Sequence, residues 1–275
     1  MFSNISFPAF GIEVNPARSF EIFGIDIYFY GVIIVCGLIL AAIYGLKRSK
    51  EFGLSQDNIL DGVLCIVPFA IVCARLYYCI FSWDMFASNP MSIFNIREGG
   101  LAIYGGVIGA IIGIIVFCKV KKLSIGAVLD LTMLGFLIGQ SIGRWGNFIN
   151  REAFGAETTS FLRMGLFNET TQTWTYYHPT FLYESIWNAI GFVILHFLSK
   201  KRQYDGQIAL GYAVWYGFGR MWIEGLRMDS LYIGPFRVSQ MLAGASFIIA
   251  TIVLIVLARK KHDTKNLFVN KANNN

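Results

Sequence analysis

The sequence predicts an all-α, polytopic membrane protein with about seven transmembrane helices. Of its 275 residues, 55% are hydrophobic and only 15% are charged. The mean hydropathy of +0.55 is far above that of a soluble domain of this length. Apolar runs of about 20 residues, the length that crosses a hydrocarbon core of roughly 30 Å, recur along the chain. The protein is therefore expected to fold in lipid.

Seven apolar runs are the predicted spans. In chain order they are Ile27–Leu46, Ile59–Phe81, Leu101–Cys118, Ile125–Ile142, Phe181–Leu198, Gln207–Ile223 and Val238–Leu257. The residues before the first run lack the pattern of a signal peptide, so no removable leader is expected. Residues 1–258 are interpreted as one transmembrane domain with a structured outer loop at about 143–178, because so long a connection is usually functional. Residues 259–275 are interpreted as a basic and polar cytoplasmic tail, whose end is expected to be disordered.

Basic residues predict the orientation, because cytoplasmic loops carry an excess of Lys and Arg. Seven spans put four basic clusters on the side of the C-terminus, so the N-terminus is expected outside. The clusters are Lys47/Arg48/Lys50, Lys119/Lys121/Lys122, Lys200/Lys201/Arg202 and the tail from Arg259 to Lys271. All 11 lysines then lie in the cytoplasm. Topology thus explains the net charge of +6 without a nucleic-acid partner.

The five cysteines are expected to be small apolar packing residues, because all fall within predicted spans and none forms a Cys-x-x-Cys pair. They are Cys36, Cys65, Cys73, Cys79 and Cys118. No disulfide, metal ion or cofactor is expected, and any thiol chemistry must use a thiol from another molecule.

Ionisable residues in the outer halves of the spans indicate a functional site, because a charge at the bilayer centre costs at least about 2.5 kcal/mol. The predicted topology brings six of them, from four helices, to one depth: Arg75, Arg144, Glu184, Arg220, Glu224 and Arg227. In the sixth span Tyr216 precedes three of them at intervals of four, four and three residues, which stacks the set on one helix face. The alternative interpretation is a structural ion pair between Arg220 and Glu224.

The segment from Gly143 to Glu152 is a candidate phosphate clamp at the end of the fourth span. Guanidinium groups offer a fork of donors that matches phosphate oxygens, and the outer face carries arginines but no lysine. The alternative is an ordinary helix end with a snorkelling Arg144. The remaining outer arginines are expected to be surface charges: Arg18, Arg97, Arg163 and Arg237.

Two further helix starts carry candidate residues. The fifth span begins at His178-Pro179. Glu184 is expected to point into the bundle. His178 is either a site residue or an interfacial hydrogen-bonding residue. In the third span the pairs Gly99-Gly100 and Gly105-Gly106 bracket Tyr104. Gly105, Gly109 and Gly113 recur at four-residue spacing, which indicates close helix packing in lipid. At the two pairs, backbone amides could also bind an anion.

These blocks resemble one family, the prolipoprotein diacylglyceryl transferases of bacterial membranes, over nearly the whole chain. The matching blocks follow in the family's order: Tyr30-Gly31, the segment around Tyr104, Gly143-Arg144-x-Gly146-Asn147-Phe148-x-Asn150-x-Glu152 up to Gly155, His178-Pro179-Thr180-x-x-Tyr183-Glu184, and Tyr216-x-x-x-Arg220-x-x-x-Glu224-x-x-Arg227. The third block resembles the family signature and is highly specific.

The resemblance implies an enzyme of the bacterial cell membrane with its active site toward the outer face. It implies that the diacylglyceryl group of phosphatidylglycerol passes to the thiol of a preprolipoprotein's lipobox cysteine, which forms a thioether and releases glycerol phosphate. The implied catalytic residues are Arg144, Arg220, Glu224 and Tyr104. The implied substrate-binding residues are Arg144, Tyr30, Asn147, Asn150, Glu152, Gly155, His178, Tyr183, Glu184, Tyr216 and Arg227.

Tyr104 departs from the family pattern, because many members carry histidine before the second glycine pair. A tyrosine hydroxyl, with an ordinary pKa of about 10, is a poor general base. The thiol is therefore expected to be activated by the field of the arginines, with Glu224 or another carboxylate accepting its proton.

Two other classes compete with this interpretation. A small transporter would also bury an arginine/glutamate site, but its charges should spread through the membrane depth. An intramembrane protease needs a Ser/His or paired-Asp arrangement, and the only histidine within a span, His196, is expected near the cytoplasmic end.

Overall fold

The computed structural model describes residues 2–96, 99–228 and 232–272, so Arg97 lies outside the described residues. The chain divides into two compact units. The first consists of Met1–Ile43, Thr132–Gln203 and Gln207–His262, and the second of Tyr44–Leu131, Tyr204–Gly206 and Asp263–Asn275. Helices α1 (Phe29–Arg48) and α4 (Ile125–Asn150) contribute residues to both units.

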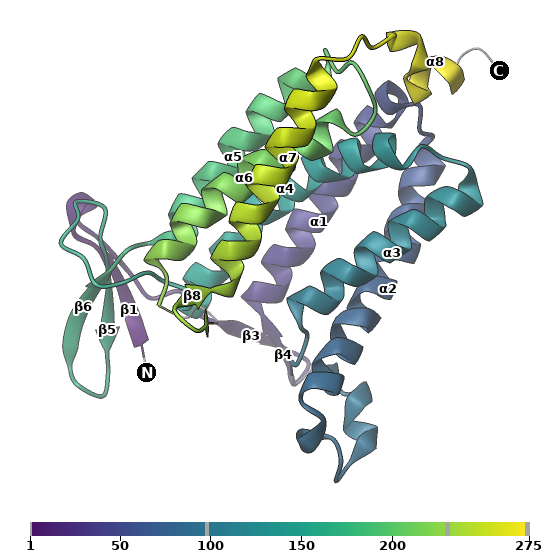
Figure 1. Ribbon diagram of the computed structural model, residues 1–275. Helices are drawn as coiled ribbons and strands as arrows, with labels where there is room; N and C mark the ends of the chain where they lie inside the picture. Colours follow the sequence, from purple (N-terminus) through teal and green to yellow (C-terminus); the bar gives the residue numbers. More distant parts are fainter. Residues whose placement is uncertain (1, 97–98, 229–231, 273–275) are drawn as a thin grey trace. The chain divides into compact units, whose positions relative to one another are not determined.

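Three helices of the first unit pack as neighbours, with α6 (Gln207–Leu226) in contact with both α5 (Thr180–Ser199) and α7 (Val238–Ala258) (Figure 1). A stacked pair of tryptophans joins α5 to α6. The rings of Trp187 and Trp215 lie 4.3 Å apart between centroids, and each indole N–H donates to the other residue's main-chain carbonyl, at 3.0 and 2.9 Å. Helix α4 is tied to α5 by Ser141 and Ser185, whose hydroxyls each donate to the other's carbonyl.

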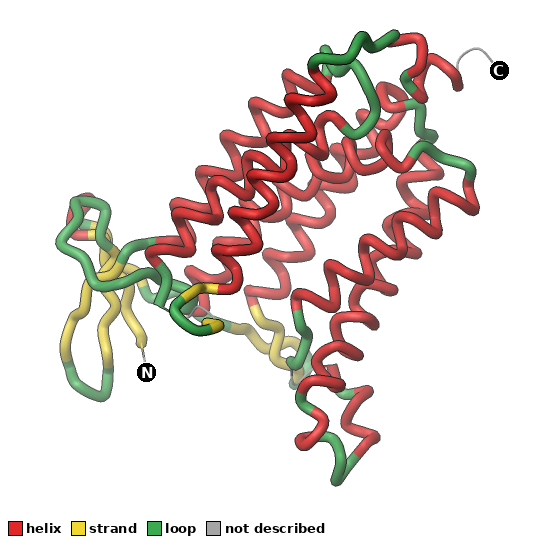
Figure 2. The backbone as a smooth tube through the Cα atoms, in the orientation of Figure 1, coloured by secondary structure: helices red, strands yellow, loops and turns green. Residues whose placement is uncertain are grey.

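Strands of the first unit gather at one end of its helices (Figure 2). β1 (Phe2–Phe7), β2 (Ile12–Val14), β5 (Met164–Asn168) and β6 (Thr173–Tyr177) form an antiparallel sheet in the order β2-β1-β5-β6. A small core of Ile5, Met164 and Leu166 packs on Phe181 in the first turn of α5. The sheet is therefore anchored to the helix that carries Glu184.

Two short hairpins lead directly into helices of this unit. β3 (Ser19–Ile22) and β4 (Ile25–Tyr28) precede α1, and β7 (Tyr232–Ile233) and β8 (Phe236–Arg237) precede α7. The protein is mostly helical, but these strands correct the all-α prediction. Among the described residues, four of the five strand pairings join consecutive strands, and one, between β1 and β5, joins segments far apart in the sequence, such as Ile5 with Leu166. A search for apolar runs long enough to span a membrane does not detect strands this short.

The second unit is built on α2 (Gln56–Phe81) and α3 (Ile103–Lys121), which pack along each other. The predicted close approach at the glycines is confirmed at Gly109, where a Cβ would lie 2.6 Å from the Cβ of Cys73. Short 3₁₀ helices of the second unit lie at Ser49–Phe52, Trp83–Met85, Pro90–Phe94 and Thr264–Asn266, and one of the first unit lies at Pro8–Phe10.

The C-terminal tail is folded as far as Ala272. It forms α8 (Phe268–Ala272), and the backbone N–H of Phe268 donates to Asp205 at 2.9 Å. Leu267 is buried. The expected disorder is therefore wrong up to Ala272, because Leu267 is buried and Asp205 accepts a hydrogen bond from the first amide of α8. Residues 273–275 lie outside the described part of the chain.

Six helices of the described chain are long and apolar enough to cross a membrane, which confirms the prediction of a polytopic membrane protein. They are α2, α3, α4, α5, α7 and α1 with its extension to Phe52. The segment predicted as another span at Gln207–Ile223 is a helix, α6, but it is not among the six. The predicted end of the fourth span at Ile142 is wrong, because α4 continues to Asn150.

Candidate active site

The helical extension of α4 sets the geometry of the site. The segment from Gly143 to Asn150 was expected to leave the helix, but it remains helical, so Arg144 and Asn147 lie one turn apart on the same side. The guanidinium of Arg144 donates to the side-chain amide oxygen of Asn147 at 3.1 Å. The glycines and polar side chains that indicate a helix end are compatible with helix here, since neighbouring elements supply their partners.

Arg151 follows the helix and has a structural role. It adopts a left-handed backbone conformation, and its buried guanidinium donates to the Ser3 and Pro16 carbonyls at 2.7 and 2.8 Å. A further bond at 2.7 Å reaches the side chain of Asn15. Arg151 therefore fastens the N-terminal segment to the end of α4, and of the two arginines in the predicted clamp only Arg144 faces the site network.

Glu184 is the centre of the site. Its side chain is 3% exposed, and its two carboxylate oxygens bind different arginines. One oxygen accepts from Arg144 of α4 at 2.6 Å, and the other accepts from Arg220 of α6 at 2.9 Å. The prediction that Glu184 points into the bundle is confirmed. One carboxylate thus holds two guanidinium groups side by side, although they come from different helices.

Glu224 completes the ionic cluster from the next turn of α6. Its carboxylate lies 2.5 Å from the Arg220 guanidinium, and its side chain is almost fully buried. Arg237, expected to be a surface charge, instead donates to the main-chain carbonyl of Glu224 and to the Tyr232 hydroxyl. The four charges of Arg144, Glu184, Arg220 and Glu224 sum to zero, which makes it tolerable to bury the two carboxylates and most of the two arginines.

Amide side chains extend the network toward the surface. The Asn147 amide donates to Glu152 at 3.0 Å, and the Asn150 amide donates to the same carboxylate oxygen at 3.3 Å. Tyr30 lies against this group, since a Cβ on Gly146 would come within 2.5 Å of its ring. Only glycine at position 146 therefore lets Tyr30 approach α4 beside Arg144.

Gly155 lies where three segments of the site meet. Its N–H donates to the carbonyl of His178 at 2.9 Å, its backbone pairs with Arg227, and a Cβ there would lie 2.7 Å from that of His178. Arg227 therefore stands just beyond α6, and the predicted helical stripe ends at Glu224. The Nδ1 atom of His178 lies 3.3 Å from the hydroxyl of Tyr183, another predicted substrate-binding residue, and this contact is compatible with both interpretations of His178.

Tyr216 faces the cluster, and sequence reasoning missed its neighbour Tyr212. Tyr216 interacts with Arg144 and stacks on Tyr212, with ring centroids 5.5 Å apart. The hydroxyl of Tyr212 donates to Gln140 of α4 at 3.2 Å. The signal was present in the sequence, because Tyr212 continues the four-residue spacing of Tyr216, Arg220 and Glu224 by one turn.

Two predicted residues, Tyr104 and Arg75, belong to the second unit. Tyr104 lies in the first turn of α3 and is partly exposed. The buried guanidinium of Arg75 donates five hydrogen bonds, all to main-chain carbonyls of residues 92–100. Arg75 therefore holds a loop of its own unit.

The arrangement in the first unit is suited to binding an anion. The Arg144 side chain remains 22% exposed, whereas the carboxylate that pairs with it is nearly inaccessible. A guanidinium group has five N–H donors. An arginine that donates one or two hydrogen bonds to carboxylate and amide oxygens therefore has further N–H groups available for a ligand. Helix packing and two buried carboxylates hold the arginine pair in place before a ligand arrives.

Comparisons with known proteins identify the family of this chain. Residues 17–257 match the sequence profile of the family described as prolipoprotein diacylglyceryl transferase. A phosphatidylglycerol–prolipoprotein diacylglyceryl transferase of Enterococcus faecalis is 43% identical, over 90% of this chain and 92% of its own. Proteins of the same name from Clostridioides difficile and Bacillus cereus are 40% and 42% identical, over 88% and 85% of this chain and 95% and 88% of their own. This chain therefore belongs to the prolipoprotein diacylglyceryl transferase family.

Proposed function

We propose that this protein transfers the diacylglyceryl group of phosphatidylglycerol to the thiol of a lipobox cysteine in a preprolipoprotein signal peptide. The observation that carries the proposal is the bridging of Arg144 and Arg220 by Glu184. Two adjacent guanidinium groups match the oxygens of a phosphodiester. Relatives that are similar over most of their length bear the name of this reaction.

The arginine pair acts on the leaving group. The cysteine thiolate attacks the glyceryl carbon next to the phosphate, a carbon–sulfur bond forms and the carbon–oxygen bond breaks. Negative charge then accumulates on the departing glycerol phosphate. Arg144, which is partly exposed, contacts the headgroup, and Arg220 stabilises the developing charge, while Glu224 orients Arg220.

The thiol is activated by the same positive field, which favours the thiolate. Among the site's carboxylates, Glu184 and Glu224 are buried in ion pairs with arginines, whereas Glu152 is exposed. Glu152 is therefore better suited than Glu224 to accept the thiol proton. Tyr30, Asn147, Asn150 and Tyr216 surround the arginines and contribute to binding the headgroup, and the backbone of Gly155 positions His178 and Arg227.

The proposed setting is the bacterial cell membrane, with seven spans, the N-terminus outside and the active site toward the outer face. The span that is added to the six apolar helices is α6, the sixth in chain order, whose charged residues are paired within the first unit. The basic clusters support this orientation. The protein's partners are phosphatidylglycerol, the lipobox segment and the bilayer itself.

A reconstituted assay tests the proposal. Purified protein, phosphatidylglycerol labelled in its acyl chains and a lipobox peptide should yield a labelled thioether, and a peptide with serine in place of cysteine should yield none. Absence of the thioether, or undiminished product with Arg144→Ala, would refute it.

A further inference from the structure

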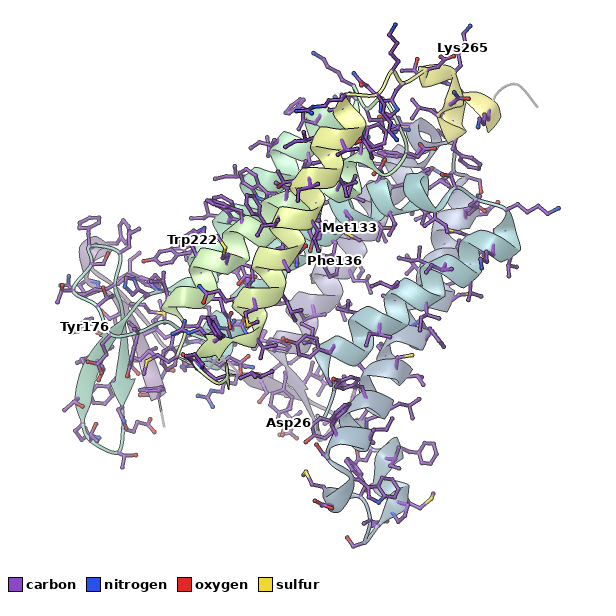
Figure 3. The ribbon with its side chains drawn as sticks, viewed as in Figure 1. Asp26, Met133, Phe136, Tyr176, Trp222 and Lys265 are labelled. Atoms are coloured by element: carbon purple, nitrogen blue, oxygen red, sulfur yellow. The ribbon has the colours of Figure 1, made fainter. Side chains whose placement is uncertain are left out.

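The β3–β4 hairpin has two chemically different faces. Its register pairs Phe20 with Ile27 and Ile22 with Ile25, so these four side chains share one face of the ribbon. Glu21 is paired with Asp26 on the opposite face (Asp26 is labelled in Figure 3). One face is thus apolar and the other acidic, which is the pattern of a ribbon at a boundary between water and an apolar phase.

The rest of the protein leaves the apolar face uncovered at its turn end. Ile22 and Ile25 are 43% and 51% exposed, and Phe23 at the turn is fully exposed. An isolated two-stranded hairpin is at best marginally stable in water, so a surface of this kind needs a partner. The β5–β6 hairpin differs, because it belongs to the four-stranded sheet and its turn carries only polar residues, Glu169 to Gln172.

Phe23 occupies a position where an apolar aromatic residue is unfavourable. Phe23 and Gly24 have φ angles of 51° and 77°, and two-residue turns of this kind favour Asn-Gly. A bulky residue in the left-handed region is strained, and strain of this kind marks functional positions. Since Phe23 is fully exposed, no packing within the protein compensates for this strain.

The position of the hairpin identifies its partner. β4 ends at Tyr28 and the membrane-spanning helix α1 begins at Phe29 (Figure 1). On the apolar face, the ring of Phe20 lies 5.0 Å from the ring of Phe29 in the first turn of α1, measured between centroids. Ile27 of the same face lines an open groove of about 480 Å³ that also includes Val32 and Val35 of α1, together with Asp26 and Tyr28. The uncovered face is therefore continuous with a surface that lipid must cover.

The hairpin before α7 repeats this design independently. Ile233 pairs with Phe236, and both side chains are at least 60% exposed. Their neighbours Tyr232 and Arg237 pair on the other face, with the guanidinium 5.6 Å from the ring centroid. Two hairpins that each precede a membrane-spanning helix thus expose apolar residues in the same way.

We propose that the β3–β4 hairpin is a membrane-insertion element, whose apolar face and Phe23 lie among the phospholipids at the bilayer interface beside the start of α1. Glu21, on the opposite face, faces the water, and Asp26 borders the groove on α1. The hairpin thereby anchors the N-terminal segment, which Arg151 ties to the end of α4 next to the candidate active site.

Photo-crosslinking tests this proposal in the full-length protein. p-Benzoylphenylalanine is placed singly at position 23 or 25, and at two control positions: Glu21 on the acidic face and Thr171 at the turn of the polar hairpin. Each protein is reconstituted in vesicles of phosphatidylethanolamine and phosphatidylglycerol with radiolabelled acyl chains. Positions 23 and 25 should give at least about ten-fold more labelled lipid adduct than the controls.

Equal lipid labelling at all four positions, or crosslinks from position 23 to a second protein chain, would overturn the proposal. Because all four positions are exposed, failure of the variants to fold is not expected, and thermal unfolding of each variant checks this. The readout requires no transferase activity, so its failure is distinguishable from failure of the proposed function.

Discussion

Glu184 determines the charge balance of the candidate site. Two guanidinium groups placed side by side in a buried site repel each other unless a negative group lies between them. Glu184 fills that position with one carboxylate oxygen for each arginine, and Glu224 supplies the second negative charge. Removing either buried carboxylate leaves an uncompensated positive charge, whereas adding an anionic headgroup places a new negative charge beside an exposed donor.

Glu184→Gln tests this balance. The amide has nearly the same shape but loses the charge and turns N–H donors toward an arginine, so unfolding should become easier by about 3 kcal/mol. Transfer activity should fall on the order of 100-fold. Thermal unfolding and turnover in detergent measure the two effects. Asp61→Asn is the matched control, because its ion pair with Lys121 is exposed and should have little effect. Normal turnover by Glu184→Gln would contradict the account.

Tyr104→Phe tests how the thiol is activated. If the arginine field is sufficient, removal of the hydroxyl should change turnover by less than about three-fold, because no general base is lost. Turnover with a lipobox peptide and binding of labelled phosphatidylglycerol are measured on the same preparation. Loss of turnover with intact phospholipid binding would show that the Tyr104 hydroxyl takes part in the chemistry.

At the scale of elements, the register between α5 and α6 decides whether Glu184 meets Arg220. The Trp187/Trp215 pair lies near that contact, and its two reciprocal hydrogen bonds would both break if one helix slid along the other. Flexible arginine side chains tolerate small shifts, but stacked indoles do not. The tryptophan pair is therefore assigned the role of positioning the two helices.

Trp187→Phe and Trp215→Phe each remove one N–H donor and keep an aromatic ring. Each should lower kcat on the order of ten-fold with little change in KM, and the double variant should be less impaired than the product of the two effects. Trp222→Phe is the control, because its ring is partly exposed and meets that of Trp187 edge-on, with centroids 6.1 Å apart (Trp222 is labelled in Figure 3). A lower unfolding temperature with unchanged kcat would limit the pair to a stabilising role.

The helices, which are defined by long apolar runs, were predictable from the sequence, whereas the short hairpins and the pairing of distant strands were not. The apolar runs located the helices to within a few residues, except at the end of α4. There the glycines and amides from Gly143 to Asn150 indicate a helix end, but Glu184, Glu152 and Tyr30 supply their contacts from elsewhere in the chain. The pairing of β1 with β5 was missed for the same reason.

The candidate site was predictable as a set of residues but not as a network. Charges in spans and the spacing on α6 identified Arg144, Glu184, Arg220 and Glu224. The sequence could not indicate that Glu184 bridges two arginines, or that Arg237 donates to the main-chain carbonyl of Glu224. It also could not indicate that Arg75 and Arg151 donate hydrogen bonds to main-chain carbonyls. Each of these depends on contacts between residues far apart in the sequence.

At the scale of the whole molecule, the distribution of lysine makes the proposed topology testable. If all 11 lysines face the cytoplasm, a membrane-impermeant amine reagent applied to sealed spheroplasts should label none of them. The same reagent should label lysines of the basic clusters after permeabilisation. Peptide mass spectrometry reads both results, and a lysine labelled in sealed spheroplasts would refute the orientation.

The most direct test of the central claim is the single-turnover rate of transfer in vesicles of phosphatidylglycerol. Arg144→Lys and Arg220→Lys keep the charge but lose the fork of donors, and Arg163→Lys, a partly exposed arginine outside the network, is the control. The account predicts rates about 100-fold lower for the first two variants and an unchanged rate for the control. Near-normal rates for Arg144→Lys and Arg220→Lys would contradict it.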